Sequence, residues 1–382
     1  MDALRRGALV RDYAATVLSL RNAGALTTAV CTLVVLGCPG GAPASQGSVS
    51  AAQRESYVAP NGSDTGPGTQ ARPWKTLRKA LSSLRPGRRV VVRAGVYRER
   101  LEVGSGGSDA EPAEIVAYPG EHPVLIGRLR VIADHVRVAR LVLDGTGGAA
   151  FDSSLYIAGA QDVEVSECEI RNAVGSGVFV GDDGNSSGNV SLVRNWIHDN
   201  GTDDFHDHGI YWAQGNGGLI GNNLIEKSAG FGVHLYPDAN NVRVSNNTVV
   251  GSGRSGIIVA GDKSSESDRN VIVNNIVAFN GELGIRSSFD EGVGTGNLVR
   301  RNLLFGNTAG DLPTGRYAAG LAFAKDNRVA DPRFVGRAKG DYRLQPSSSA
   351  LDKADPAHSL LRDISGKRRP VGRGPDIGAY ER

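Results

Sequence analysis

The chain has 382 residues, and its 43 Lys and Arg nearly balance its 40 Asp and Glu, which gives a formal net charge of +3. This balance excludes an extended basic surface of the kind that nucleic acids or anionic membranes bind, because no basic stretch exceeds the short run Lys367–Arg369. Glycine is abundant, with 52 residues, and 6 % of the residues are aromatic. We therefore expect a globular chain with no nucleic-acid partner.

The first 44 residues have the features of an export signal, and residues 45–56 those of a linker. Arginines precede an apolar run from Ala25 to Gly37, which is too short for a permanent membrane span. Two processing routes stay open. Residues 35–38 are similar to a lipobox, in which Cys38 would be acylated and would tether the protein to a membrane, whereas residues 42–44 are similar to an ordinary cleavage site. Either route predicts an extracytoplasmic location.

Residues 57–100 are predicted to form an N-terminal cap and the first strands. Pro73 is followed by apolar residues at helical spacing, which predicts an amphipathic helix with the proline near its first turn. Because an open stack of strands presents unpaired edges, we expect the apolar side of this helix to plug the first coil. The apolar residues are Trp74, Leu77, Leu81 and Leu84.

Residues 101–310 contain a repeat. Its marker position recurs every 24 to 28 residues, and short apolar alternations around it predict strands and tight turns. A period of this size is typical of solenoids, whose units bury their apolar faces by stacking. We predict an all-β fold, a single-stranded right-handed parallel β-helix of about 8 to 10 coils. The marker residues are Arg140, Cys168, Asn195, Asn223, Asn247, Asn275 and Asn302.

Asparagine at the marker position suits a turn in which its amide bonds to the same amide one coil away, ~4.8 Å along the stack. Cys168 occupies this column and is expected to pack as a small apolar residue. Once the export signal is removed, no cysteine is left to form an intrachain disulfide with it.

One repeat is longer than its neighbours. The regular repeats run nine residues from the marker to a glycine, as from Asn275 to Gly284, but the run from Asn195 to Gly209 takes fourteen. The excess is most simply residues 202–206, which are followed by an aspartate and a histidine. An insertion in a stacked repeat forms a loop on one face, often the binding face.

Strand alternation sorts the side chains that follow each glycine. One set faces the core, and the other forms an outward column. Neighbours in this column lie one strand spacing apart, so Tyr211 and His234 are expected to touch, with Arg286 ~10 Å along the groove. The column comprises Phe179, Tyr211, His234, Ile258 and Arg286.

The opening of the cap resembles that of secreted parallel β-helix proteins, including family-nine-type pectate lyases. The matching segments are Tyr57-Val58-Ala59-Pro60-Asn61-Gly62-Ser63-Asp64, Pro73-Trp74-Lys75-Thr76 and Ala94-Gly95-Val96-Tyr97. The resemblance implies a β-helix that acts on polysaccharides outside the cytoplasm. Lyases of this kind use a calcium-binding aspartate cluster and a lysine base, but Lys227 and Lys263 fall in turns and do not match that base.

The end of the chain, residues 311–382, resembles the choice-of-anchor C-terminal module of bacterial surface β-helix proteins. The segments that carry this resemblance are Asp331-Pro332-Arg333-Phe334, Asp341-Tyr342-Arg343-Leu344 and Asp376-Ile377-Gly378-Ala379-Tyr380-Glu381.

The inserted loop and the outward column together suit proton abstraction next to a uronate carboxylate, which needs a base, an acid and a cation or metal. His234 or His208 is the candidate base, since imidazole titrates near neutrality. Tyr211 is the candidate acid and Arg286 the carboxylate clamp. The candidate substrate-binding residues are Asp203, Asp204, His206, Asp207, Phe179 and Tyr236.

Metal binding stays open. Asp203, Asp204 and Asp207 offer loop oxygens that calcium accepts, and His206 and His208 have a spacing that zinc accepts, although further ligands are not fixed by the sequence.

The leading hypothesis is a secreted or surface-attached monomer with lyase or epimerase activity on an acidic glycan such as pectate or alginate. The alternatives are a non-catalytic glycan-binding or adhesion protein and a glycoside hydrolase that uses paired carboxylates.

Overall fold

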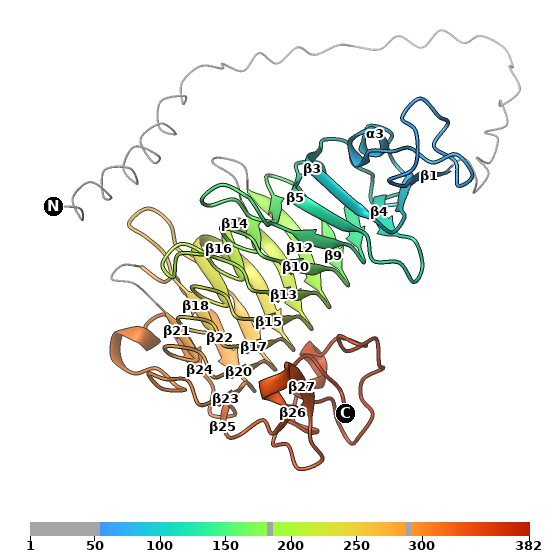
Figure 1. The fold of residues 1–382 in the computed structure, drawn as a ribbon. Helices are drawn as coiled ribbons and strands as arrows, with labels where there is room; N and C mark the ends of the chain where they lie inside the picture. Colours follow the sequence, from blue (N-terminus) through green and yellow to red (C-terminus); the bar gives the residue numbers. More distant parts are fainter. Residues whose placement is uncertain (1–53, 182–185, 288–291) are drawn as a thin grey trace, which may run out of the picture. The chain divides into compact units, whose positions relative to one another are not determined.

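The structure is a computed structural model that describes residues 54–181, 186–287 and 292–382 (Figure 1). The predicted export signal and most of the predicted linker lie outside these residues. Across the described ranges, no helix is long and apolar enough to cross a bilayer.

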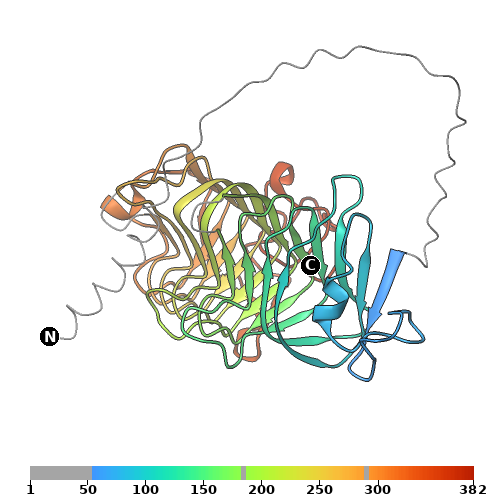
Figure 2. The same ribbon diagram turned by 90° about the horizontal axis from the view of Figure 1, so that it is seen from above.

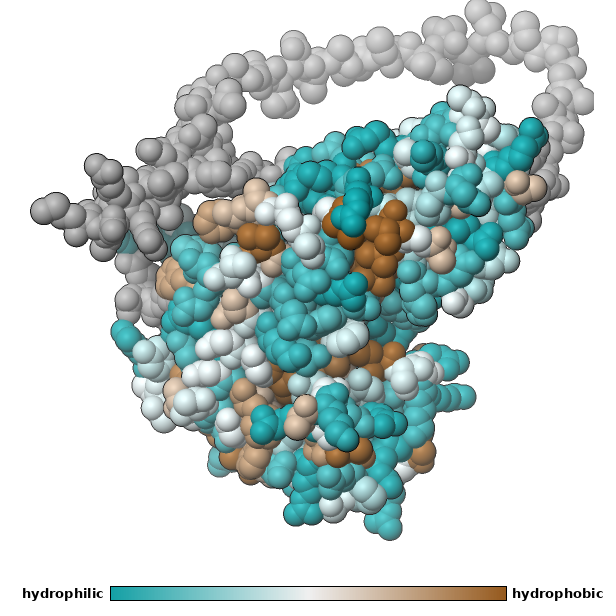
Figure 3. All heavy atoms as spheres, in the orientation of Figure 1, coloured by the Kyte–Doolittle hydropathy of each residue, from teal (hydrophilic) through white to brown (hydrophobic). Residues whose placement is uncertain are grey.

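The strands wind into a parallel β-solenoid of about 9 turns, whose stacked coils are seen from two directions in Figures 1 and 2. Three parallel sheets form its sides, and among the described residues the third sheet ends two coils before the other two. The surface in Figure 3 is largely hydrophilic, with hydrophobic residues in separate patches. The predicted all-β solenoid is confirmed.

The first sheet runs the whole length of the solenoid. It comprises β1 (Glu55–Val58), β2 (Arg89–Val92), β4 (Ala113–Ala117), β6 (Val136–Ala139), β9 (Glu164–Ser166), β12 (Ser187–Val193), the second halves of β14 (Ile210–Gly221) and β16 (Val233–Ser245), β19 (Val271–Val273), β22 (Asn297–Arg300) and β24 (Leu321–Phe323).

The second sheet follows the marker position in each coil. It comprises the first halves of β3 (Val96–Val103) and β5 (Val124–Val131), then β7 (Val142–Asp144), β10 (Glu169–Arg171), β13 (Trp196–His198), β15 (Leu224–Glu226), β17 (Thr248–Val250), β20 (Ile276–Ala278), β23 (Leu303–Phe305) and β25 (Arg328–Val329).

The third sheet carries the outward column. It comprises the second halves of β3 and β5, β8 (Leu155–Ile157), β11 (Val178–Val180), the first halves of β14 and β16, β18 (Ile257–Val259) and β21 (Ile285–Ser287). Its inward residues are fully buried, as the alternation predicts; they include Val178, Val180, Ile210, Trp212, Val233 and Leu235.

An asparagine ladder closes the turn between the first and second sheets. Each side-chain amide donates to the amide oxygen of the next asparagine over 2.9 to 3.1 Å. The predicted ladder is therefore confirmed, and it extends one coil further, to Asn327. Its members are Asn195, Asn223, Asn247, Asn275, Asn302 and Asn327. Cys168 is buried in the same column, where its backbone N–H donates to Asn195 Oδ1 over 2.9 Å.

Arg140 does not belong to the marker column. Glu169 pairs with Val142, so the residue opposite Cys168 is Leu141, and Arg140 lies one position earlier. There it takes a positive φ of 61°, as Glu167 does at 56° in the next coil. The sequence assignment was wrong by one residue because the marker position in this coil is apolar.

The predicted cap helix is shorter than expected. It is α3 (Leu77–Leu81), which begins after Thr76, whose hydroxyl accepts from the Lys79 N–H. Before it, Asp64 accepts bonds from the backbone N–H groups of Lys75 and Thr76, which holds that segment outside the helix. Trp74 instead forms a bridge with Val58, so Pro73 lies before the helix, and the prediction that placed it near the first turn was wrong. Its apolar residues are buried, as predicted.

The C-terminal segment lies along the side of the solenoid (Figure 1). It contains the antiparallel strands β26 (Phe334–Gly336) and β27 (Asp341–Leu344) and the short helical turns η2 (Gly315–Ala318), η3 (Arg337–Lys339) and η4 (Pro356–His358). The first and second sheets continue to β24 and β25, past the predicted repeat boundary at residue 310.

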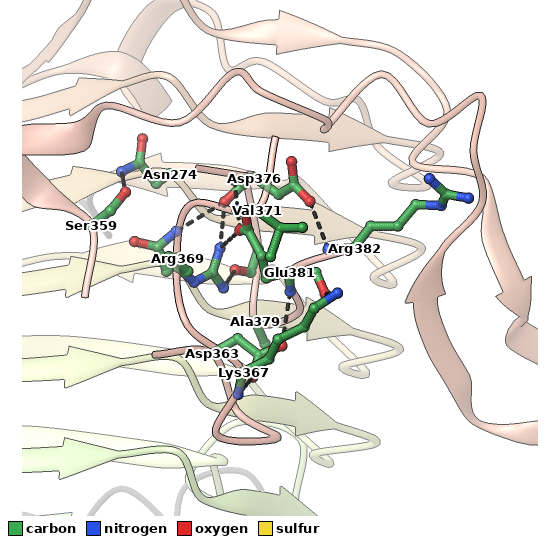
Figure 4. A network of polar contacts seen from close by, with 12 residues as sticks. Asn274, Ser359, Asp363, Lys367, Arg369, Val371, Asp376, Ala379, Glu381 and Arg382 are labelled. Carbon is green, nitrogen blue, oxygen red and sulfur yellow. Dashed lines mark hydrogen bonds and ion pairs between the residues drawn. The ribbon is translucent and has the colours of Figure 1, made fainter. Parts of the chain in front are cut away.

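Apolar packing holds this segment against the outer face of the second sheet. Residues of the segment, such as Phe334, Tyr342 and Ile377, form one buried cluster with Leu224 and Ile276 of that sheet. Polar contacts add to it: Figure 4 shows the buried network around Arg369, Asp376 and Glu381.

Candidate functional site

The outward column has the predicted register. In the third sheet Phe179 pairs with Tyr211, Tyr211 with His234, His234 with Ile258, and Ile258 with Arg286. The Tyr211 and His234 rings are stacked, with centroids 5.0 Å apart and an interplanar angle of 12°. Phe179 meets Tyr211 edge to face at 5.0 Å. The predicted contact between Tyr211 and His234 is therefore present.

The inserted loop forms one wall of a cleft of about 660 Å³ above this column. Residues 202–206 are exposed, as an insertion on the outer face should be, whereas Asp207 and His208 are buried. The cleft is lined by Phe151, Ser153, Ser176, Phe179, Phe205, His206, Asp207, His208, Tyr211, His234, Tyr236, Gly261 and Asp262. Of the sequence-predicted residues, Asp203, Asp204 and Arg286 are not among these lining residues.

Two carboxylates give the loop its shape. Asp207 Oδ2 accepts hydrogen bonds from the backbone N–H groups of Thr202 and Asp203, over 3.0 and 2.8 Å. Asp203 Oδ1 accepts from the N–H groups of Phe205 and His206, over 2.8 and 3.2 Å. The bond from the Phe205 N–H is the main cause that lowers the pKa of Asp203. These carboxylates act as turn acceptors, an arrangement that does not favour the paired-carboxylate hydrolase.

The aspartates of the loop do not gather around a common point that suits a metal. Among the described residues, the group with such geometry is Asp109, His135 and Asp162. There His135 Nδ1 lies 3.2 Å from Asp109 Oδ1 and 3.7 Å from Asp162 Oδ2. These residues do not line the cleft, so calcium at the loop stays a prediction without support from geometry.

The two buried histidines form a pair with a defined proton arrangement. The Phe231 N–H donates to His208 Nδ1 over 3.2 Å, so neutral His208 carries its hydrogen on Nε2. That Nε2–H donates to His234 Nδ1 over 2.8 Å, which leaves the hydrogen of neutral His234 on Nε2. Both nitrogens of His208 are thus engaged, which does not favour it as a zinc ligand.

Burial keeps both imidazoles neutral. Desolvation lowers the pKa of His208 to about 3, and electrostatic interactions with the nearby His206 and Arg254 act in the same direction. Desolvation also places the pKa of His234 well below its ordinary value. In this arrangement neither ring keeps a lone pair for a substrate proton, so the geometry does not favour the predicted base role. It instead makes His234 a hydrogen-bond donor through Nε2–H.

Tyr211 is half-buried between aromatic neighbours. Desolvation raises its pKa, and the nearby Tyr236 and Asp262 add to the effect. The hydroxyl is consequently protonated at neutral pH, as the predicted acid role requires. Tyr236 stacks on the His234 ring at 5.2 Å and lines the cleft.

Arg286 lies apart from this cleft. Its side chain is 8 % exposed, its guanidinium lies 4.3 Å from the centre of the Tyr317 ring, and Nη1 lies 3.5 Å from Glu282 Oε2. Tyr317 belongs to η2, in a coil that the sequence period did not predict. Arg286 therefore has the predicted register, but Tyr317 covers its guanidinium, and it does not line the cleft as the predicted carboxylate clamp would.

Comparison with known families matches residues 56–309 to the Pel9A-like, right-handed β-helix region. The chain belongs to this family. The solenoid is therefore right-handed, as the sequence predicts. A curated relative is the uncharacterized protein YwoF of Bacillus subtilis (strain 168), which is 28 % identical over 313 residues, or 75 % of this chain. The chain spans 64 % of the length of that relative.

Solved structures share the fold of this Pel9A-like chain. The crystal structure of pectate lyase Pel9A has a TM-score of 0.60 and 15 % identity and covers 86 % of this chain and 96 % of its own. A rhamnogalacturonan lyase has a TM-score of 0.53 and 13 % identity and covers 84 % and 96 %. At these identities the likeness concerns the fold.

Several cleft residues of the Pel9A-like chain were not predicted from the sequence. Ser176 precedes Gly177 as His208 precedes Gly209, and its hydroxyl accepts the His208 N–H over 3.0 Å; comparing these positions between repeats could have found it. Asp262 follows β18, beyond the strand residues that were sorted by alternation. Phe151 lies in a turn of an earlier coil, and no periodic signal indicates its place.

Proposed function

We propose that this protein is a secreted or surface-attached enzyme, a lyase or epimerase that acts on an acidic glycan such as pectate or alginate. The observation that carries the proposal is the convergence of Tyr211, His234 and the inserted loop on one cleft. Aromatic rings with a few polar groups are typical of a site for a sugar chain. Membership of the Pel9A-like family, and the fold that it shares with two polysaccharide lyases, supports a glycan as the partner.

The groups in the cleft suggest their roles. His234 Nε2–H can donate to a uronate carboxylate and so stabilise the charge that develops when the neighbouring proton leaves. In a lyase the carbon–oxygen bond to the leaving sugar then breaks, a carbon–carbon double bond forms, and the Tyr211 hydroxyl protonates the leaving oxygen. The removed proton needs an acceptor. His206 lines the cleft and its Nδ1 lies 3.4 Å from Asp203 Oδ1, so its Nε2 is the candidate acceptor.

The test is turnover of defined glycans. The purified protein is incubated with polygalacturonate, alginate and glycosaminoglycans, and unsaturated products are followed by ultraviolet absorbance, with epimerisation followed by NMR. We expect turnover of an acidic glycan that falls at least a hundredfold in Tyr211→Phe, as for loss of a positioned acid. Tyr118→Phe, a half-buried tyrosine outside the cleft, is the control and should keep full activity. Full activity of both Tyr211→Phe and His234→Ala would remove the assignment.

A non-catalytic glycan-binding protein is the second candidate. The neutral, hydrogen-bonded state of His208 and His234 favours it, because neither ring keeps a lone pair to accept a substrate proton. Binding on a glycan array with no turnover of any bound glycan would establish this candidate in place of the enzyme.

Location and assembly are part of the proposal. Export through residues 1–44, a membrane tether through a lipidated Cys38 and a monomeric state are expected. Replacing Cys38 with Ala should move a tethered protein from the membrane fraction to the medium, and light scattering gives the mass in solution.

A further inference from the structure

The outward column continues beyond the cleft toward the N-terminal coils. Tyr156 pairs with Phe179, and Arg130 pairs with Tyr156, in the same register that joins Phe179 to Tyr211. Four successive strands therefore present Arg130, Tyr156, Phe179 and Tyr211 on one outer face. The distance from the first to the last is three strand spacings, ~14 Å.

Aromatic rings connect the two ends of this row. Tyr156 meets Phe179 edge to face at 4.9 Å, and Phe179 meets Tyr211 in the same way at 5.0 Å. The row is half-buried at Tyr156 and Phe179, so one side of the rings faces solvent. Such a surface suits the apolar faces of successive sugar rings, which pack against aromatic side chains.

Cations gather at the far end of the row. The guanidinium groups of Arg128 and Arg130 lie 6.0 and 5.3 Å from the centre of the Tyr156 ring. Their side chains are 30 % and 28 % exposed, so a ligand can reach them.

The arginines already have carboxylate partners: Asp152 is shared between Arg100 and Arg128, and Glu102 pairs with Arg130. Because exposed ion pairs contribute little, a ligand carboxylate can compete for the arginines.

We infer that Arg128, Arg130 and Tyr156 form a remote subsite that binds a carboxylate-bearing sugar unit of an acidic oligosaccharide. The Tyr156 ring supports the sugar, and the guanidinium groups bind its carboxylate, for which their planar, two-pronged geometry is suited. The ligand must then be an oligomer that extends from the cleft toward the N-terminal coils. The inference rests on the proposed function for the class of glycan, but it concerns binding and does not require turnover.

The experiment compares short and long ligands by calorimetry. The probes are di- and hexasaccharides of polygalacturonate and a methyl-esterified hexasaccharide, which has the same length without the charge. We expect the charged hexasaccharide to bind at least tenfold more tightly than the other two. The double variant Arg128→Gln/Arg130→Gln should lose about tenfold for the charged hexasaccharide and little for the disaccharide. Arg137→Gln, an exposed arginine on the first sheet, is the control.

The outcomes separate the subsite from the proposed function. A length- and charge-dependent affinity without turnover supports the subsite and contradicts the enzyme. Turnover together with equal affinity for the short and long ligands overturns the subsite and leaves the enzyme in place. Equal losses for both ligands in the double variant, or no binding of any probe by the native protein, also overturn it. Thermal denaturation confirms that each variant is folded.

Discussion

The buried imidazoles of the cleft make the stability of this protein sensitive to acid. His208 and His234 are both neutral in the folded state, because burial disfavours their charged forms. In the unfolded chain they regain an ordinary pKa near 6.5. Below that pH the unfolded state binds more protons than the folded state, so acid shifts the equilibrium toward unfolding.

We therefore predict that the contribution of this pair is complete above about pH 6.5 and is lost as the pH falls toward the folded-state pKa values. Each histidine should lower the free energy of unfolding by about 1.4 kcal/mol per pH unit below its unfolded pKa. Urea denaturation at pH 7.5, 5.5 and 4.5 measures the slope. The His208→Gln/His234→Gln variant should show a shallower slope than the native protein.

His122→Gln is the matched control, since His122 is exposed and should leave the slope unchanged. Equal slopes for the native protein and the double variant would mean that the buried pair does not govern the acid response.

At the residue scale, some contacts of this site could be predicted from the sequence and others could not. The period-two rule placed Tyr211 beside His234, because that contact depends on local alternation alone. The protons of His208 depend on the Phe231 N–H from the next coil, and the cover over Arg286 comes from Tyr317. Both contacts join residues from different coils, so the local sequence around His208 or Arg286 does not predict them.

At the scale of the repeated element, the asparagine ladder should be the most sensitive part of the solenoid. Asn247 accepts the backbone N–H and the side-chain amide of Asn223, over 2.9 and 3.0 Å, and donates to Ile220 O and Asn275 Oδ1, over 2.8 and 2.9 Å. All of these groups are buried. Removing the Asn247 amide leaves their bonds unmade, which costs about 1–3 kcal/mol per group.

Asn247→Ala is therefore expected to lower the free energy of unfolding by at least about 3 kcal/mol. Cys168→Ala provides the comparison in the same column, because its thiol makes only weak contacts, and it should cost about 1 kcal/mol. Chemical denaturation of both variants tests the difference. Similar losses in the two would show that the ladder contributes packing rather than hydrogen bonds.

The elements differ in how far the sequence determines them. The solenoid repeats one local pattern, so its strands, its turns and the inserted loop at residues 202–206 could be predicted. The start of α3 could not, because the Asp64 carboxylate holds the preceding residues in another conformation. The register error at Arg140 has a similar cause: its coil has Leu141 in place of the asparagine that marks the others.

At the scale of the whole molecule, a buried ion pair lies where the C-terminal segment meets the solenoid. Arg369 and Glu381 lie 2.9 Å apart, and their side chains are 1 % and 0 % exposed (Figure 4). Arg369 also donates to Gly378 O over 2.7 Å and to Asn222 Oδ1 over 3.2 Å, and Asn222 belongs to a turn of the solenoid. The pair thus joins the last residues of the chain to a coil about 150 residues earlier.

Arg369→Met should release this segment. The variant leaves the Glu381 carboxylate buried without its cation, and breaking a buried pair from one side costs about 3–5 kcal/mol. Detachment would expose the apolar outer face of the second sheet at Leu224 and Ile276, which pack against the segment in the native protein. We expect faster proteolysis between residues 330 and 382, increased binding of a hydrophobic dye and a lower unfolding temperature. Arg368→Met, an exposed neighbour, should change none of these.

A second variant separates the charge from the packing. In Arg369→Met/Glu381→Leu neither charge remains buried, so the double variant should recover much of the stability and protease resistance that the single variant loses. If the single variant behaves like Arg368→Met, the apolar cluster alone holds the segment. Recovery in the double variant would instead assign the loss to the unpaired carboxylate. The cleft on the third sheet should keep its glycan affinity throughout, because residues 330–382 pack on the second sheet.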